Sequence, residues 1–171
     1  MESVITGVFV GCTSKLFHNG KEHSTGIFKS CAEKNVKVSE LGIENDVQAD
    51  LRFHGGLDKA IYVYPDGHYG YWERQLKKPK LEDSQFGENL NISRLDDQTV
   101  LIGARYQLGS TIVEATQPQI PCFKLGVRIK DASFPARFLG AGRLGFYLRV
   151  ERPGEFKLGD SFSLLQSGES G

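Results

Sequence analysis

Short apolar and β-branched runs, separated by glycine and proline, recur along most of this 171-residue chain. Gly103, Gly109 and Gly159 fall between such runs, where tight turns are expected. We expect strands at residues 4–10, 36–38, 60–64, 99–102, 106–108, 111–115, 145–150 and 161–165. Many short strands joined by glycine turns, with one or two helices, predict a mostly-β barrel or sandwich.

Two segments show helical patterning instead. A helix is expected to open at Pro65, because proline is tolerated in a first helical turn, and to end at Pro79. Its apolar face would consist of Tyr69, Trp72 and Leu76. A second short helix is expected within residues 133–139. The chain length then fits a single domain over residues 1–166, followed by a disordered tail over residues 167–171.

Charge and cysteine content exclude several classes of protein. Lys and Arg together number 21, as do Asp and Glu, so the chain has no bulk attraction for nucleic acid or acidic membranes. No apolar run approaches the roughly 20 residues of a membrane span. Three widely spaced cysteines do not form a disulfide framework, and the first residues lack the features of a signal peptide. We therefore expect a cytoplasmic protein.

The neutral total hides an asymmetry along the chain. Residues 38–66 contain six Asp or Glu against two Lys or Arg, whereas residues 121–150 contain six Lys or Arg against one Asp. The basic segment begins beside Cys122, and cations next to a thiolate stabilise it and attract anionic ligands. The same charges could equally lie on solvated strand faces.

Cys122 lies in a stretch where Pro118 and Pro121 fix two backbone φ angles and remove two amide donors. This predicts a stiff loop rather than a paired strand. A thiolate held in such a loop can ligate a transition metal, or act as a nucleophile or sulfur acceptor. Alternatively, Cys122 is a small buried apolar residue.

Two other short elements could contribute to a site. His54, Gly55 and Gly56 precede the strand at residues 60–64, and paired glycines let successive amides form an anion-binding nest. His54 would offer a proton or a hydrogen bond near neutral pH. The alternative is a glycine turn beside a surface histidine. Further along, Gly87-Glu88-Asn89 could hold a heterocycle or orient a loop.

A zinc site is a further alternative near the N-terminus. Cys12, His18, His23 and Cys31 carry suitable donor atoms, but their spacing matches no standard site. Residues 11–25 are polar, with a turn signal at Asn19-Gly20, and are expected to form a loop.

The order of the motifs is more specific than any one of them. The series is His54-Gly55-Gly56-Leu57-Asp58-Lys59-Ala60, Phe86-Gly87-Glu88-Asn89-Leu90, Gln117-Pro118-Gln119-Ile120-Pro121-Cys122-Phe123-Lys124-Leu125 and Gly159-Asp160. It resembles the MOSC domain family, named for the C-terminal domain of molybdenum cofactor sulfurases, and most of all its stand-alone, YiiM-like bacterial branch. The resemblance extends over nearly the whole chain, from Gly26-Ile27-Phe28-Lys29 through Leu41-Gly42-Ile43-Glu44-Asn45-Asp46 to Gly159-Asp160.

The resemblance implies a fold, a cofactor and an activity. The fold would be a MOSC-type β-barrel with a few short helices. The family cysteine matches Cys122, which would ligate the metal of a molybdenum–pterin cofactor; pyridoxal phosphate is not expected in this chain alone. Such a protein would be an oxidoreductase that reduces N-hydroxylated compounds, for example hydroxylaminopurine-type bases. A separate electron-donor protein would supply its electrons.

The resemblance also implies site residues. Cys122 and His54 would be the catalytic residues, and the cofactor would lie against Gly55, Gly56, Asp58, Lys59, Gly87, Glu88, Asn89, Lys124, Arg128 and Arg143. The last three are chosen by charge, as partners for the pterin phosphate. An arginine often stands in the family where this chain has Gln119, so one anion contact is expected to be missing.

Two other functions stay open at this point. Cys122 could carry a persulfide for the assembly of a metal–sulfur centre, with a cysteine desulfurase as partner. Alternatively, the chain could be a non-catalytic β-barrel that binds a partner. For the enzyme, we expect a small N-hydroxylated substrate and neither nucleic acid nor a membrane as partner.

Overall fold

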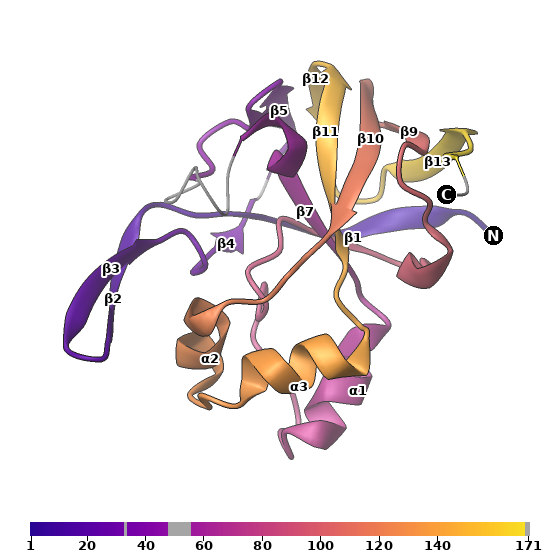
Figure 1. Cartoon of the computed structure of the whole chain (residues 1–171). Coiled ribbons are helices and arrows are strands. Elements are labelled where there is room, and N and C mark those ends of the chain that lie inside the picture. Colours follow the sequence, from indigo (N-terminus) through magenta and orange to yellow (C-terminus); the bar gives the residue numbers. More distant parts are fainter. Residues whose placement is uncertain (33, 48–55, 170–171) are drawn as a thin grey trace.

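Seven strands close into a barrel in the computed structural model, which describes residues 1–32, 34–47 and 56–169 (Figure 1). Around the barrel the order is β1-β8-β7-β11-β10-β9-β13, and β13 pairs again with β1 through Ser3↔Phe162 and Val4↔Ser161. All pairs are antiparallel except β7 with β8. The strands are β1 (Ser3–Val10), β7 (Ile61–Pro65), β8 (Leu90–Ile92), β9 (Arg105–Leu108), β10 (Thr111–Pro118), β11 (Phe146–Arg152) and β13 (Ser161–Gln166).

Strand β7 shows how the apolar pattern builds two cores. Because side chains alternate along a strand, Ile61 and Val63 face the barrel interior, whereas Tyr62 and Tyr64 face outward. The outward tyrosines are also buried, because helices cover that face. A strand buried on both faces shows no polar alternation, which explains the continuous apolar run at residues 60–64.

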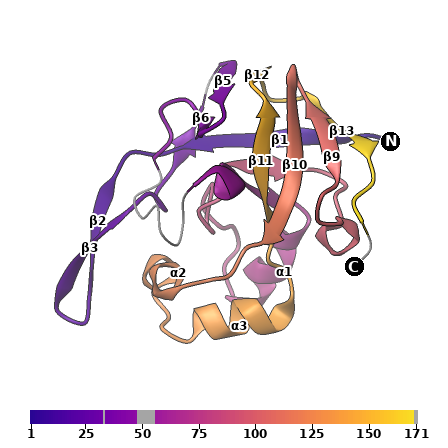
Figure 2. The same cartoon turned by 45° about the horizontal axis from the view of Figure 1, so that its top comes forward.

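Three helices gather at one end of the barrel, as both orientations show (Figures 1 and 2). They are α1 (His68–Gln75), α2 (Phe123–Ile129) and α3 (Phe134–Ala141). Between them and β7 lies an aromatic cluster in which the Trp72 ring stacks on Phe138 at 5.6 Å between centroids. Trp72 Nε1 also donates a hydrogen bond of 2.9 Å to the Tyr64 hydroxyl, so its polar group is satisfied inside the core. None of the helices in the described ranges has the length and apolar content needed to cross a lipid bilayer.

The remaining strands lie outside the closed barrel. A hairpin of β2 (Ser14–His18) and β3 (Lys21–Thr25) projects from it (Figure 1). The hairpin contacts α2 through Phe123, whose ring stacks on His18 at 4.7 Å and meets His23 edge-on at 4.8 Å. Short strands β5 (Val36–Ser39), β6 (Gly42–Ile43) and β12 (Gly154–Phe156) form a second sheet, and β4 (Ser30–Cys31) pairs with β1.

The sequence predicted the mostly-β barrel and most of its strands, and these predictions are confirmed. The strand expected at residues 99–102 is wrong. A 3-10 turn, η2 (Asp97–Thr99), occupies this segment, because the Asp96 side chain accepts a hydrogen bond from the Gln98 amide and bends the chain. The apolar residues that suggested a strand, Leu101 and Ile102, are exposed.

Three other expectations need correction. Residues 11–25 are not a loop, because the turn at Asn19-Gly20 joins β2 and β3. The first helix does not open at Pro65, which ends β7 by pairing with Ile92; it begins at His68 and ends at Gln75, before Pro79. Helix α2 was not expected, and the second predicted helix is α3. Of the expected tail, residues 167–169 follow β13 without regular structure, and 170 and 171 lie outside the described residues.

Candidate functional site

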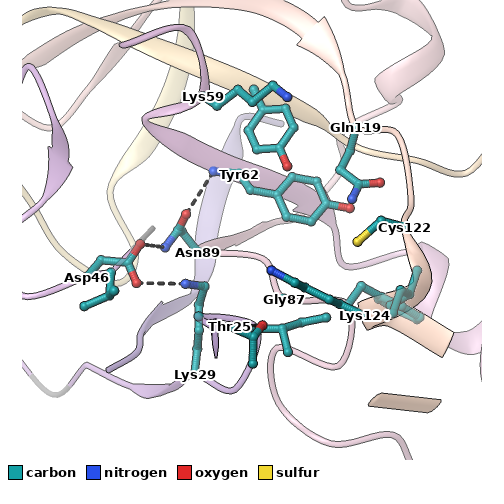
Figure 3. A pocket seen from close by; sticks show the side chains of 16 residues that line it. Thr25, Lys29, Asp46, Lys59, Tyr62, Gly87, Asn89, Gln119, Cys122 and Lys124 are labelled. Atoms are coloured by element: carbon teal, nitrogen blue, oxygen red, sulfur yellow. Dashed lines mark hydrogen bonds and ion pairs between the residues drawn. The ribbon is translucent and has the colours of Figure 1, made fainter. Parts of the chain in front are cut away.

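A pocket of about 100 Å³ opens between β7, α2 and the segment that follows β3 (Figure 3). It has room for several water molecules or for part of a small ligand. Its wall combines one thiol, three lysines, two phenols and two side-chain amides. The residues that supply these groups are Lys29, Lys59, Tyr62, Asn89, Gln119, Cys122, Lys124 and Tyr147.

Cys122 is the nucleophilic and metal-ligating side chain of this pocket. Strand β10 ends at Pro118, and the stretch that contains Pro121 leads to an extended residue at the start of α2, where the Cys122 carbonyl accepts from the Leu125 amide at 3.1 Å. The expected stiff loop is therefore the short connection from β10 to α2. The side chain is partly exposed and lines the pocket, which does not fit a cysteine that serves only as a small core residue.

A buried ion pair forms the opposite wall. Lys29 Nζ lies 2.8 Å from Asp46 Oδ1, and their side chains are only 7% and 6% exposed. Asp46 Oδ1 also accepts from the Gly11 amide at 3.0 Å, and its Oδ2 accepts from Asn89 Nδ2 at 2.8 Å. Asn89 Oδ1 in turn accepts from the Tyr62 amide at 2.9 Å (Figure 3). The network ties the segment after β3 to β7, so these polar groups hold fixed positions.

Two buried phenols complete the wall near the thiol. Burial raises the pKa of Tyr147, the nearby Cys122 raises it further, and a hydrogen bond with Gln119 opposes part of the shift. Burial likewise raises the pKa of Tyr62 well above its ordinary value, and the Tyr62 hydroxyl donates to the Leu144 carbonyl at 2.6 Å. Both hydroxyls therefore keep their protons at neutral pH.

The lysines of the pocket are held by different contacts. Lys124 Nζ donates to the Ser24 carbonyl at 2.9 Å, which joins β3 to α2. The Lys59 ammonium lies over the Tyr147 ring at 5.6 Å from its centroid. Lys29 is paired with Asp46. The pocket is therefore cationic through three elements, not through the basic segment 121–150 alone.

The structure brings together five of the residues expected from the sequence: Lys59, Gly87, Asn89, Cys122 and Lys124. His54 and Gly55 lie outside the described residues, and Gly56 is described but does not line the pocket.

Glu88 is expected in the pocket but lies behind it, fully buried. Its Oε1 accepts from the Tyr69 hydroxyl and from Asn91 Nδ2 at 2.9 Å, and its Oε2 accepts from the Phe86 amide at 3.1 Å. Strand alternation explains the difference, since Glu88 and Asn89 point to opposite sides of the chain. Of the two roles considered for this motif, Glu88 takes that of orienting a loop.

The other charged candidates also point elsewhere. Asp58 pairs with Arg149 at 2.9 Å on the surface. Arg143 lies over the Tyr71 ring at 4.3 Å and contacts His68 Nδ1 at 3.1 Å, on the helical side of the molecule. Arg128 stacks on Phe28 at 5.0 Å and pairs with Glu82 at 3.4 Å. The phosphate contacts assigned by charge to Arg128 and Arg143 therefore do not lie on the pocket wall.

Sequence reasoning missed Lys29, Asp46, Tyr62 and Tyr147 as site residues. Lys29 and Asp46 do fall in the two early segments that carry the family resemblance, and this was the available signal. The zinc alternative gains no support: His18 and His23 pack against Phe123, and no three His, Cys, Asp or Glu side chains in the described part of the chain could share a metal ion.

Known proteins resemble this chain in sequence and in fold. A family model described as the MOSC domain matches residues 50–163. "Uncharacterized protein YflK" of Bacillus subtilis is 38% identical over 162 residues, which cover 95% of this chain and 73% of that protein. "Protein YiiM" of Escherichia coli is 31% identical over 133 residues, covering 77% of this chain and 59% of that protein. A "Reductase" of Gibberella moniliformis is 35% identical over 150 residues, covering 86% of this chain but only 27% of that protein.

A solved structure agrees with these similarities. YiiM from Geobacillus stearothermophilus superposes with a TM-score of 0.77 at 28% identity, covering 96% of this chain and 75% of that one. This chain thus spans less than two thirds of the length of the second and third sequence relatives.

Proposed function

This chain belongs to the MOSC domain family, and we propose that it binds a molybdenum–pterin cofactor in the pocket, with Cys122 as the protein ligand to the metal. MOSC domains are generally associated with this cofactor. The observation that carries the proposal is the partly exposed Cys122 thiol on the wall of a polar, cationic pocket. Thiolate is a soft ligand suited to transition metals.

The residues of the pocket fit such a group. A pterin presents N–H donors and ring acceptors, and the wall offers amide groups from Gln119 and Asn89. The phosphate of the cofactor is an anion, and Lys59 and Lys124 are the candidate partners from the pocket wall. The cofactor, when bound, would supply the two-electron redox chemistry that the side chains lack.

We propose that the reaction is the reduction of a small N-hydroxylated compound. The balance is R–NHOH plus two electrons and two protons, giving R–NH₂ and water, with the electrons supplied by a separate donor protein. One of the relatives is named a reductase, and this supports the assignment. Tyr147, which keeps its proton and lies near Cys122, is placed to hydrogen-bond the oxygen that leaves as water.

We expect the Cys122→Ser variant to lose molybdenum, because a hydroxyl is a poor substitute for a soft thiolate ligand. Wild type made in a host that synthesises the cofactor should contain molybdenum and pterin, and the variant at least about tenfold less molybdenum per chain. Inductively coupled plasma mass spectrometry and pterin fluorescence measure the two contents.

The matched controls are Cys12→Ser and Cys31→Ser, which change exposed cysteines away from the pocket and should leave the metal content unchanged. A wild type without molybdenum, or a Cys122→Ser variant that keeps it, would contradict the proposal.

The accessibility of the same thiol favours a second candidate, a sulfur carrier. A cysteine desulfurase would pass its persulfide sulfur to Cys122, which gives a Cys122 persulfide and restores the desulfurase thiol. A mass increase of about 32 Da on the Cys122 peptide, removed by reductant, is the expected signature. If no such adduct forms after incubation with a desulfurase and cysteine, this second function is excluded.

A further inference from the structure

The Gln119 side chain is buried on the pocket wall with an unused acceptor. It is 8% exposed, and its Oε1 accepts no hydrogen bond from any residue that the structure describes. Figure 3 shows its amide beside the Cys122 sulfur. A buried carbonyl oxygen without a partner is costly, and such groups in folded proteins commonly meet a ligand or a water molecule.

The groups around Gln119 limit what can satisfy it. Lys124 is engaged with the Ser24 carbonyl and Lys29 with Asp46, so neither ammonium is directed at the Gln119 oxygen. The Tyr147 hydroxyl, which keeps its proton, interacts with the same amide. The missing partner is therefore a donor that enters the pocket from outside the protein.

We propose that Gln119 is a specificity-determining residue, which selects a ligand with an N–H or O–H donor next to Cys122. A neutral amide oxygen accepts hydrogen bonds and gives an anion nothing to bind. The ligand group at this point is accordingly a neutral donor such as an amine, an amidine or an N-hydroxyl, and not a carboxylate or phosphate. This inference rests on the proposed function only in placing the ligand in the same pocket.

Two sources could supply this donor: a pterin N–H of the cofactor, or an N–H or O–H of the substrate. The Gln119→Leu variant removes the acceptor at similar volume, and Gln119→Glu keeps an acceptor and serves as the matched control. Both are made as the full chain in the cofactor-competent host, with thermal unfolding as the check on folding.

The first readout is the molybdenum and pterin content of each variant. The second is the dissociation constant of benzamidoxime, which carries N–H and O–H donors, measured by titration calorimetry against its fully methylated N,N,O-trimethyl analogue, which carries none. A buried donor left unpaired in Gln119→Leu weakens binding by about tenfold or more.

Each pattern of results decides the inference. If Gln119→Leu keeps the cofactor and binds benzamidoxime at least about tenfold more weakly, with the methylated probe unaffected, the donor belongs to the substrate. If Gln119→Leu loses pterin while Gln119→Glu retains it, the donor belongs to the cofactor. The inference is overturned if Gln119→Leu matches wild type in cofactor content and in its response to both probes, including the case where neither protein binds them. A wild type that lacks molybdenum but distinguishes the probes through Gln119 supports this inference while it contradicts the proposed function.

Discussion

Replacing Asp46 with alanine is expected to lower the free energy of unfolding by about 3–5 kcal/mol, the usual cost of breaking a buried ion pair from one side. The variant leaves the Lys29 ammonium buried without its carboxylate. It also removes the acceptor of the Gly11 amide and of Asn89 Nδ2. Urea unfolding, followed by the fluorescence of Trp72, the one tryptophan of the chain, measures the change.

Two control variants separate the buried charge from other effects. In the double variant Lys29→Met/Asp46→Ala both charges are absent, and most of the lost stability should return, because no uncompensated ion is then buried. Glu22→Ala breaks the exposed pair with Lys15, whose side chains are 69% and 47% exposed, and should cost less than about 1 kcal/mol. The explanation fails if Asp46→Ala costs no more than Glu22→Ala, or if the double variant is as unstable as the single one.

The Asp46 network also shows what the sequence could and could not predict. Local patterns predicted the barrel, because glycine turns and alternating or continuous apolar runs determine strands over a few residues at a time. They also placed Cys122 in a stiff connection, since Pro118 and Pro121 act locally. Lys29 and Asp46 meet only after the segments following β3 and β6 fold against each other, and no local pattern signals this pairing.

Charge counting along the chain failed for a similar reason. The basic stretch at residues 121–150 suggested one cationic site, but its side chains leave three different surfaces. Arg149 pairs with Asp58 and Glu114, and Arg137 pairs with Asp131. Only Lys124 of this stretch lines the pocket, and its other two lysines come from earlier in the chain. Sequence proximity describes a charged site only when one element supplies it.

Glu88 carries the second large prediction, since three donors converge on its carboxylate inside the protein. We expect Glu88→Ala to lower the free energy of unfolding by about 4–6 kcal/mol, because each buried donor left unpaired costs roughly 1–3 kcal/mol. Asn91 and Tyr69 are two of these donors, and Asn91 also donates to the Tyr64 carbonyl. The loss therefore reaches β7 and, through it, the pocket.

The pH dependence gives Glu88 a signature that a packing defect lacks. Burial raises the pKa of this carboxyl above its ordinary 4.5, against the opposing hydrogen bonds from Tyr69 and Asn91. A raised pKa means that the folded state binds the proton more tightly than the unfolded state. The stability contributed by that proton is therefore full below pH 4.5 and is lost as the pH rises through the folded-state pKa.

Glu88→Gln cannot titrate and serves as the reference for this effect. Other carboxyls titrate equally in both proteins; the pKa of Asp97, for instance, is lowered because hydrogen bonds from His68 and Gly145 outweigh desolvation. The difference in unfolding free energy between wild type and Glu88→Gln therefore isolates Glu88, including the constant cost of facing the Phe86 amide with an NH₂ group. We expect wild type's advantage to shrink as the pH rises from about 4.5 toward 8, measured by urea unfolding at each pH. A difference that is flat across this range, or that grows, would show that Glu88 is ionised with an ordinary or lowered pKa and that its three donors outweigh the cost of burial.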